Sequence, residues 1–338
     1  MKKDFRIVVD ATADLDPAWL AVHGDQVKVI PIAVVDDGET RYDCVGQTPG
    51  SYRSKLLNEI IDEGFTTVDS FYDRLIAQRA HKKIVRSTFA QAAAYAMFEE
   101  LFEDGIPFIY IGMTSALSGA YEHSSNILLH DLAPNYPDVR VQAIDSRCIA
   151  PGYRLLIERL MMQDVGFDDV IKFIEQERES IVHLFTINDF EQALAGGRVK
   201  PTEAIVGNLL SVRPCMRFDY RHVPTLKKEL FTSAKARGDK NLNRKFIQEI
   251  KARIATEDQR REDPSKGIIV VSHAQAPERA ERFAEQLRAE MPPDIKILGG
   301  RVGPAVGSHV GETTLAIFFT AKEPSTQNEP TWQEYIGR

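Results

Sequence analysis

The stretch that decides the fold is FIYIGMTSALSGAY, residues 108–121. It begins with a short apolar run, which predicts a buried strand, and continues into a loop rich in hydroxyl side chains. An amphipathic segment at residues 121–132 follows and predicts a helix. In parallel α/β folds, ligands bind at the loop between the carboxyl end of a strand and the next helix. The hydroxyls of Thr114, Ser115 and Ser118, beside a helix amino terminus, therefore predict a neutral cradle for an anionic group.

Strands and helices are expected to alternate along the first half of the chain. Strands are predicted at residues 5–9, 27–35, 107–112 and 139–144. The segment 41–84 contains two polar amphipathic stretches, a helix is expected from Phe89 to Asp104, and Pro151 opens another at a position where proline is tolerated. This alternation predicts a parallel sheet with helices on both faces.

The second half has a different pattern. Two neighbouring strands are expected around a turn at 219–222, a long charged helix follows, and a polar linker is expected at 256–266. Further strands and a helix lead to a glycine-rich loop at 299–309, before a terminal strand and a polar tail. The expected ranges are 182–186, 210–218, 223–231, 268–272, 295–298 and 314–319 for strands, and 167–180, 239–256 and 277–290 for helices.

Length and composition restrict the class of protein. A chain of 338 residues is long for one domain, and we place a domain boundary near residues 160–165. The net charge of −7 argues against a nucleic-acid-binding protein. No apolar run approaches the roughly 20 residues that span a bilayer, so no stable membrane insertion is expected. The three isolated cysteines and the absence of a secretory leader indicate a cytoplasmic protein without a metal cluster of thiolates.

Two acidic residues each follow a predicted strand directly. Asp10 and Asp145 are interpreted as loop-organising residues that accept backbone N–H groups, in preference to general bases. A Ser118–His309–Asp145 triad can be drawn on paper, but the positions two residues before and after Ser118 are Ala116 and Ala120 and not the glycines of a nucleophile elbow. Hydrolysis is therefore not favoured, and no catalytic residue is assigned.

Two further residues stand in glycine-rich surroundings, and each has two interpretations. His309 is either a structural histidine or a ligand contact, because its small neighbours allow close approach to a ligand. Arg198 follows Gly196-Gly197, which is typical of a helix end with a solvated arginine. The same arginine also suits contact with a partner protein, because arginine is enriched at interface hot spots.

Taken together, these segments resemble the DegV family of bacterial fatty-acid-binding proteins over about residues 5–320. The resemblance rests on seven motifs that occur in the family's order. They are Asp10-Ala11-Thr12-Ala13-Asp14-Leu15, Ser115-Ala116-Leu117-Ser118-Gly119-Ala120-Tyr121, Asp145-Ser146, Leu194-Ala195-Gly196-Gly197-Arg198, Leu209-Leu210-Ser211-Val212-Arg213-Pro214, Lys235-Ala236-Arg237-Gly238 and Gly307-Ser308-His309-Val310-Gly311.

The resemblance implies a two-domain α/β fold that encloses one long-chain fatty acid between its domains. The N-terminal domain, 1–162, would hold a mainly parallel sheet and an enlarged helical segment at 41–84. The C-terminal domain, 163–322, would hold a mixed sheet, and 323–338 would form a polar tail. The ligand-binding residues it implies, combined with the hydroxyl loop, are Thr114, Ser115, Ser118, Gly119, Ser87, Arg86 and His309.

In this family the bound fatty acid is the ligand and no cofactor is expected. Where members work with a fatty-acid kinase, the protein presents the acyl group for phosphorylation, and Arg198 is the implied docking residue. The family's binding loop corresponds to residues 85–89, where Arg86 replaces a threonine. Arg86 would add a charge-assisted contact or select a more highly charged headgroup. Two alternatives stay open: an enzyme acting on a small carboxylate or phosphate ester, and a regulatory protein whose lipid is structural.

Overall fold

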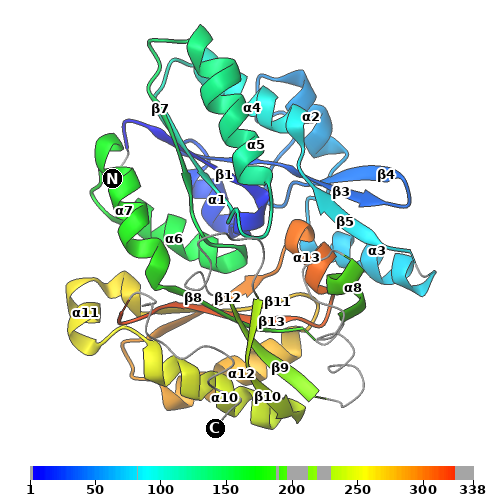
Figure 1. The fold of residues 1–338 in the computed structure, drawn as a ribbon, viewed down its shortest axis with the longest axis vertical. Coiled ribbons are helices and arrows are strands. Elements are labelled where there is room, and N and C mark those ends of the chain that lie inside the picture. Colours follow the sequence, from blue (N-terminus) through cyan, green and yellow to red (C-terminus); the bar gives the residue numbers. More distant parts are fainter. Residues whose placement is uncertain (1–2, 82, 188–189, 196–211, 219–229, 324–338) are drawn as a thin grey trace. The chain divides into compact units, whose positions relative to one another are not determined.

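The computed structural model describes residues 3–81, 83–187, 190–195, 212–218 and 230–323 (Figure 1). The chain forms two compact units. The first comprises residues 1–176 together with 302–308, and the second comprises 177–301 together with 309–338. The boundary expected near residue 162 therefore lies inside the first unit, and a short segment from late in the sequence belongs to that unit as well.

A four-stranded sheet forms the centre of the first unit. Its strand order is β2-β1-β6-β7, and every neighbouring pair is parallel, as the alternation of strands and helices predicted. All five residues of β6 are buried, because helices cover both faces of the sheet. The strands are β1 (Arg6–Asp10), β2 (Val27–Ile30), β6 (Phe108–Gly112) and β7 (Val141–Asp145).

Helices on the two sides of this sheet bury separate sets of apolar side chains. Figure 1 shows α4 and α5 on one side and α6 on the other. Phe98 and Phe102 of α4 pack against Phe108 of β6, with ring centroids 6.1 and 5.1 Å apart. On the other side, the Tyr153 hydroxyl of α6 donates to the Ile111 carbonyl. The helices are α1 (Pro17–His23), α2 (Lys55–Asp62), α3 (Val68–Ala80), α4 (Gln91–Glu103), α5 (Ala120–Asn126), which continues as a π-helical turn (Ile127–Leu132), α6 (Ala150–Met162) and α7 (Val170–Glu177).

The single strand expected at 27–35 is wrong, because the chain changes sheet at Pro31. β2 ends at Ile30, and β3 (Ile32–Asp36) belongs to a second, antiparallel sheet of order β4-β3-β5. Proline has no N–H to donate to a sheet ladder, so it suits the break between the two strands. The other strands of this sheet are β4 (Glu39–Asp43) and β5 (Val85–Thr88), the second of which replaces the loop expected at 85–89.

The second unit contains a six-stranded mixed sheet of order β10-β9-β8-β13-β11-β12. Only β11 and β12 run parallel to each other, and the other neighbouring pairs are antiparallel. The mixed sheet implied by the family resemblance is therefore present. The strands are β8 (Ile181–Thr186), β9 (Val212–Phe218), β10 (Leu230–Arg237), β11 (Ile268–His273), β12 (Lys296–Arg301) and β13 (Leu315–Thr320).

Two long helices, α10 (Gly238–Arg253) and α12 (Pro277–Glu290), cover one face of this sheet (Figure 1). Phe246 and Phe283 form the centre of the core beneath them and meet edge to face at 6.0 Å. The described part of the unit also contains α8 (Phe190–Ala195) and α11 (Glu257–Glu262).

Three expectations for the second unit are corrected. The strand expected to end at 231 continues in β10 to Arg237, while its first part, 223–229, and the turn expected at 219–222 lie outside the described residues. The glycine-rich loop at 299–309 is instead the end of β12 and a short helix, α13 (Pro304–Val310). Glycine lowers the propensity for both helix and strand, so the secondary structure of this segment depends on its packing and not on local propensity.

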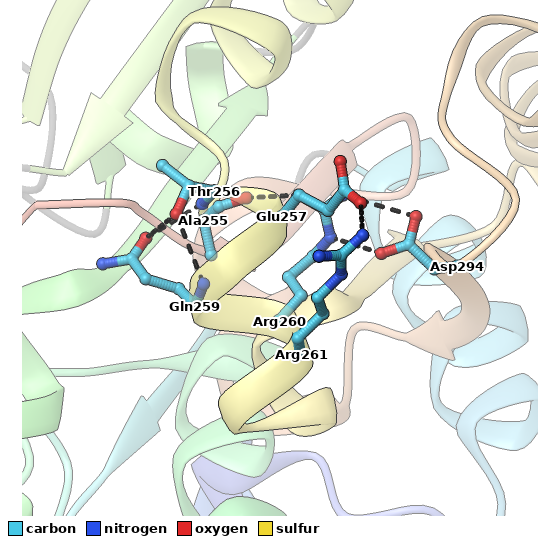
Figure 2. Close-up of polar contacts among 7 residues, drawn as sticks. All are labelled: Ala255, Thr256, Glu257, Gln259, Arg260, Arg261 and Asp294. Atoms are coloured by element: carbon cyan, nitrogen blue, oxygen red, sulfur yellow. Dashed lines mark hydrogen bonds and ion pairs between the residues drawn. The ribbon is translucent and has the colours of Figure 1, made fainter.

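The third correction is that the polar linker expected at 256–266 contains α11. Thr256 and Gln259 form a capping box at its start, as Figure 2 shows. Arg260 then fastens the helix: its Nε lies 2.7 Å from Asp294 Oδ2, and its Nη1 donates to the Ala255 carbonyl at 2.5 Å. The helix has almost no apolar face, so the buried Arg260 side chain, and not a set of apolar side chains, attaches it to the rest of the unit.

Candidate functional site at the carboxyl end of the parallel sheet

The connections from β1 and β6 lead to opposite sides of the parallel sheet, since β1 is followed by its neighbour β2 and β6 by its neighbour β7. The carboxyl ends of β1 and β6 therefore flank the switch point of the sheet, where open α/β folds bind ligands. Asp10 ends β1 and lies at this point, only 1% exposed. Its Oδ2 accepts a hydrogen bond from Met113 N at 2.9 Å, while its Oδ1 accepts from Thr12 N at 3.1 Å and from the Thr12 hydroxyl.

A second carboxylate holds the other side of the hydroxyl loop. Asp145 ends β7, and its Oδ2 accepts from both the hydroxyl and the backbone N–H of Ser115, at 2.6 and 3.2 Å. Its Oδ1 accepts from Arg147 N at 2.7 Å. In addition, Thr114 N donates to the Cys148 carbonyl at 3.0 Å. The loop after β6 is thus attached to the ends of both neighbouring strands.

These contacts distinguish the three hydroxyls of the loop. Thr114 is fully buried, and its Oγ1 accepts from Ala116 N at 3.3 Å, whereas Ser115 donates its hydroxyl to Asp145. Ser118 is partly exposed, and its Oγ accepts from Ala120 N at 3.2 Å. A hydroxyl that accepts a hydrogen bond keeps its own proton to donate. The Thr114 hydroxyl keeps its proton as well, but it is fully buried, whereas Ser118 is partly exposed. Ser118 is therefore the accessible hydroxyl of the loop that is suited to donate to an anionic ligand.

The backbone around this edge of the sheet adopts an unusual conformation. Asp14 after β1, and Arg147 and Ala150 after β7, have φ angles of 49°, 51° and 54°. Residues with side chains rarely adopt such angles, and they persist where the surrounding structure enforces them. Such positions are concentrated at binding and active sites.

The segment that contains Ser87 lies against the hydroxyl loop. Phe89, directly after β5, stacks on the imidazole of His123 with 5.4 Å between ring centroids. A Cβ added at Gly119 would lie 3.5 Å from the same imidazole, so His123 lies between the two segments. Gly119 itself is exposed and directly precedes α5.

Arg86 and Ser87 point to opposite faces of β5, because successive side chains of a strand alternate. Arg86 pairs with Val35 in the antiparallel sheet and is exposed, whereas Ser87 is partly buried. A loop at 85–89 would allow both side chains to reach one site, whereas the strand conformation separates them.

The remaining predicted residues lie elsewhere in the chain. His309 is in the last turn of α13, is partly exposed and belongs to the second unit. Arg198, together with Gly196 and Gly197, lies outside the described residues.

Sequence reasoning missed a group of buried carboxyls close to the site. Asp10, Asp14 and Asp43 are all withdrawn from water, and burial raises the pKa of each, that of Asp43 to about 7. The charge of Asp10 also raises the pKa values of both other carboxyls. Asp43 ends β4, as Asp10 and Asp145 end their strands, and this shared position was the available signal. Within the described ranges, no three His, Cys, Asp or Glu side chains are placed to hold a metal ion.

Comparison with known proteins assigns the chain to a family. The family model described as "Uncharacterised protein, DegV family" matches residues 4–322. The DegV domain-containing protein CPE0026 of Clostridium perfringens is 30% identical over 331 residues, which cover 95% of this chain and 100% of that protein. The chain therefore belongs to the DegV family.

Solved structures agree with the fold. A stearic-acid-binding protein of Eubacterium ventriosum has a TM-score of 0.72 at 19% identity, covering 94% of this chain and 98% of that one. The Fatty Acid Kinase (Fak) B3 protein of Streptococcus pneumoniae, solved with linoleic acid, has a TM-score of 0.70 at 18% identity, covering 94% and 99%. Across the described residues, no helix has the length and apolar character needed to cross a membrane.

Proposed function

We propose that this protein binds a long-chain fatty acid and that Ser118 donates a hydrogen bond to its carboxylate. The observation that carries the proposal is the division of roles in the loop after β6. Asp10, Asp145 and the Ser115 hydroxyl organise the loop, and the Thr114 hydroxyl is fully buried in it. The Ser118 hydroxyl is partly exposed and keeps a proton to donate. Membership of the DegV family supports a fatty acid as the ligand, since family-like folds include proteins that bind stearic and linoleic acid.

The energetics suit an acyl ligand. Each buried methylene contributes about 0.8 kcal/mol, so a long chain gains on the order of 10 kcal/mol before ordering costs are subtracted. A carboxylate that leaves water needs hydrogen-bond donors to offset its desolvation. We assign Ser118, Ser87 and His309 as these donors, with Gly119 allowing the ligand to approach the backbone.

Titration with a fluorescent C18 fatty acid, cis-parinaric acid, tests this assignment. Ser118→Ala should weaken binding by about tenfold, the size of one hydrogen bond to a charged group. Ser54→Ala is the matched control, because Ser54 caps α2 by accepting from Leu57 N and its loss should alter stability but not affinity. Unchanged affinity in Ser118→Ala would remove Ser118 from the site, and no binding by the natural protein would reject the function.

We further propose that the protein acts as an acyl carrier and not as a catalyst, and that it presents the bound acid to a fatty-acid kinase. The name of the Fak B3 neighbour supports a kinase partnership. With a purified fatty-acid kinase and ATP, Arg198→Ala should slow phosphorylation of the bound fatty acid while leaving its affinity unchanged. Equal rates for the variant and the natural protein would exclude Arg198 from docking.

A further inference from the structure

Two buried side chains of the first unit hold the segment 302–308. Asp43 Oδ2 accepts a hydrogen bond from Ala305 N at 2.9 Å, across 262 positions of sequence. The Tyr72 hydroxyl donates to the Val302 carbonyl at 3.0 Å, across 230 positions. Asp43 is 1% exposed and Tyr72 is fully buried, so water does not compete for either contact.

The same segment packs so closely that only glycine fits at two positions. A Cβ at Gly303 would collide with the carboxylate of Asp14, and one at Gly307 would collide with the Tyr72 hydroxyl. The Gly307 Cβ would also lie 2.9 Å from a ring carbon of Phe71. The close approach leaves the segment little freedom to shift, because side-chain packing on this scale resists even small displacements.

This segment contains most of α13, the helix whose last turn carries His309. Ala305 is in the first turn of the helix, four residues before His309. Residues four apart lie one above the other on a helix, so Ala305 and His309 lie on the same face of α13.

We propose that Asp43 is a positioning residue for ligand binding: it holds the first turn of α13 and thereby places His309 for the carboxylate of the fatty acid. The hydrogen bond from Tyr72 to the Val302 carbonyl is a second contact that positions the same segment. The inference rests on the proposed function, in which His309 is a carboxylate donor.

The role requires an acceptor atom and not a negative charge. Asp43 is buried close to two other carboxyls, Asp10 and Asp14. Burial raises the pKa of Asp43 to about 7, so the carboxyl is partly neutral at physiological pH. Asp43 Oδ1 also accepts from Val45 N, but at the longer distance of 3.4 Å. Asparagine can keep the shorter bond from Ala305 N through its one carbonyl oxygen and should therefore largely replace Asp43, whereas alanine should not.

Affinities for cis-parinaric acid, measured for Asp43→Ala, Asp43→Asn, His309→Ala and the double variant Asp43→Ala/His309→Ala, test the inference. We expect Asp43→Ala to weaken binding by about tenfold and Asp43→Asn by less than about threefold. In the His309→Ala background, Asp43→Ala should have almost no further effect, because the group that it positions is gone. A general loss of structure would instead weaken binding equally in both backgrounds.

Tyr72→Phe provides a second variant that removes only one hydroxyl and keeps the buried ring. It should weaken binding by a few-fold, and again only when His309 is present. Additive effects in both cycles would overturn the inference, as would an Asp43→Asn variant that binds as weakly as Asp43→Ala. If His309→Ala alone binds the fatty acid normally, His309 is not a carboxylate donor, and that part of the proposed function is wrong. If His309→Ala binds weakly while Asp43→Ala binds normally, the positioning role alone is wrong.

Discussion

The carboxylate of Asp10, at the end of β1, is bound by the backbone N–H of Met113, the first residue after β6, at 2.9 Å. This contact joins the two strands whose connections diverge, and Asp145 makes the equivalent contact with Ser115 from the other neighbouring strand. A loop held at both ends presents Ser118 in one geometry, so a ligand does not have to order it.

Replacing Asp10 should therefore affect both stability and binding. Asp10→Ala leaves the buried N–H of Met113 without its acceptor and should lower the free energy of unfolding by about 1–3 kcal/mol. Asp10→Asn should also destabilise, because both oxygens of Asp10 accept hydrogen bonds and an amide offers one acceptor. Urea denaturation measures the change, with Thr67→Ala, which removes the exposed cap of α3, as the control. A loss no larger than that of the control would contradict the structure.

The raised pKa of Asp43 predicts the direction in which pH changes stability. The folded state binds a proton at about pH 7 and the unfolded state near 3.8, so folding takes up a proton between these values. The stabilisation is complete below about pH 4 and is lost as pH rises through 7. The unfolding free energy of the natural protein, minus that of Asp43→Asn, should fall from pH 5 to pH 7 and level off above it. A difference that is constant or rises with pH would show that the pKa of Asp43 is not raised.

Gly307 and Gly299 differ in the space available for an added Cβ, so they provide a test variant and its control. Gly307→Ala places a Cβ against Tyr72 and Phe71 and should destabilise the protein by about 1–3 kcal/mol. Gly299 has no atom within 4 Å of an added Cβ, so Gly299→Ala should be close to neutral. Thermal or urea unfolding compares the two variants. Equal stability would mean that the segment 302–308 does not pack as described.

Arg260 and Arg261 are neighbours on α11 with different surroundings, as Figure 2 shows. The Arg260 side chain is 8% exposed and bonds Asp294 and the Ala255 carbonyl, whereas Arg261 is 72% exposed and pairs with Glu257. Arg260→Ala should cost about 1–3 kcal/mol, since it leaves the buried Ala255 carbonyl without its donor and removes the pair with the half-exposed Asp294. Arg261→Ala should cost less than about 0.5 kcal/mol. Arg260→Lys should restore little, because lysine lacks the planar fork. Similar losses for the two alanine variants would contradict the contacts of Arg260.

Much of the architecture follows from local pattern. The apolar runs that end in Asp10, Gly112 and Asp145 predicted three of the four strands of the parallel sheet, and the hydroxyl loop was found where a buried strand gives way to a helix. These features depend on the periodicity of neighbouring residues, which is present in the sequence before any folding occurs.

What the sequence by itself determined is therefore the order of the elements and the loop that carries Ser118. Tertiary structure alone decided that the chain changes sheet at Pro31, that the two residues Arg86 and Ser87 face opposite ways, and that Asp43 receives the N–H of Ala305. The physical reason is that pairing and packing join residues far apart in sequence, and the free energy of such contacts depends on which surfaces meet. A local pattern records which residues prefer burial or a strand, but not the partner that each one finds.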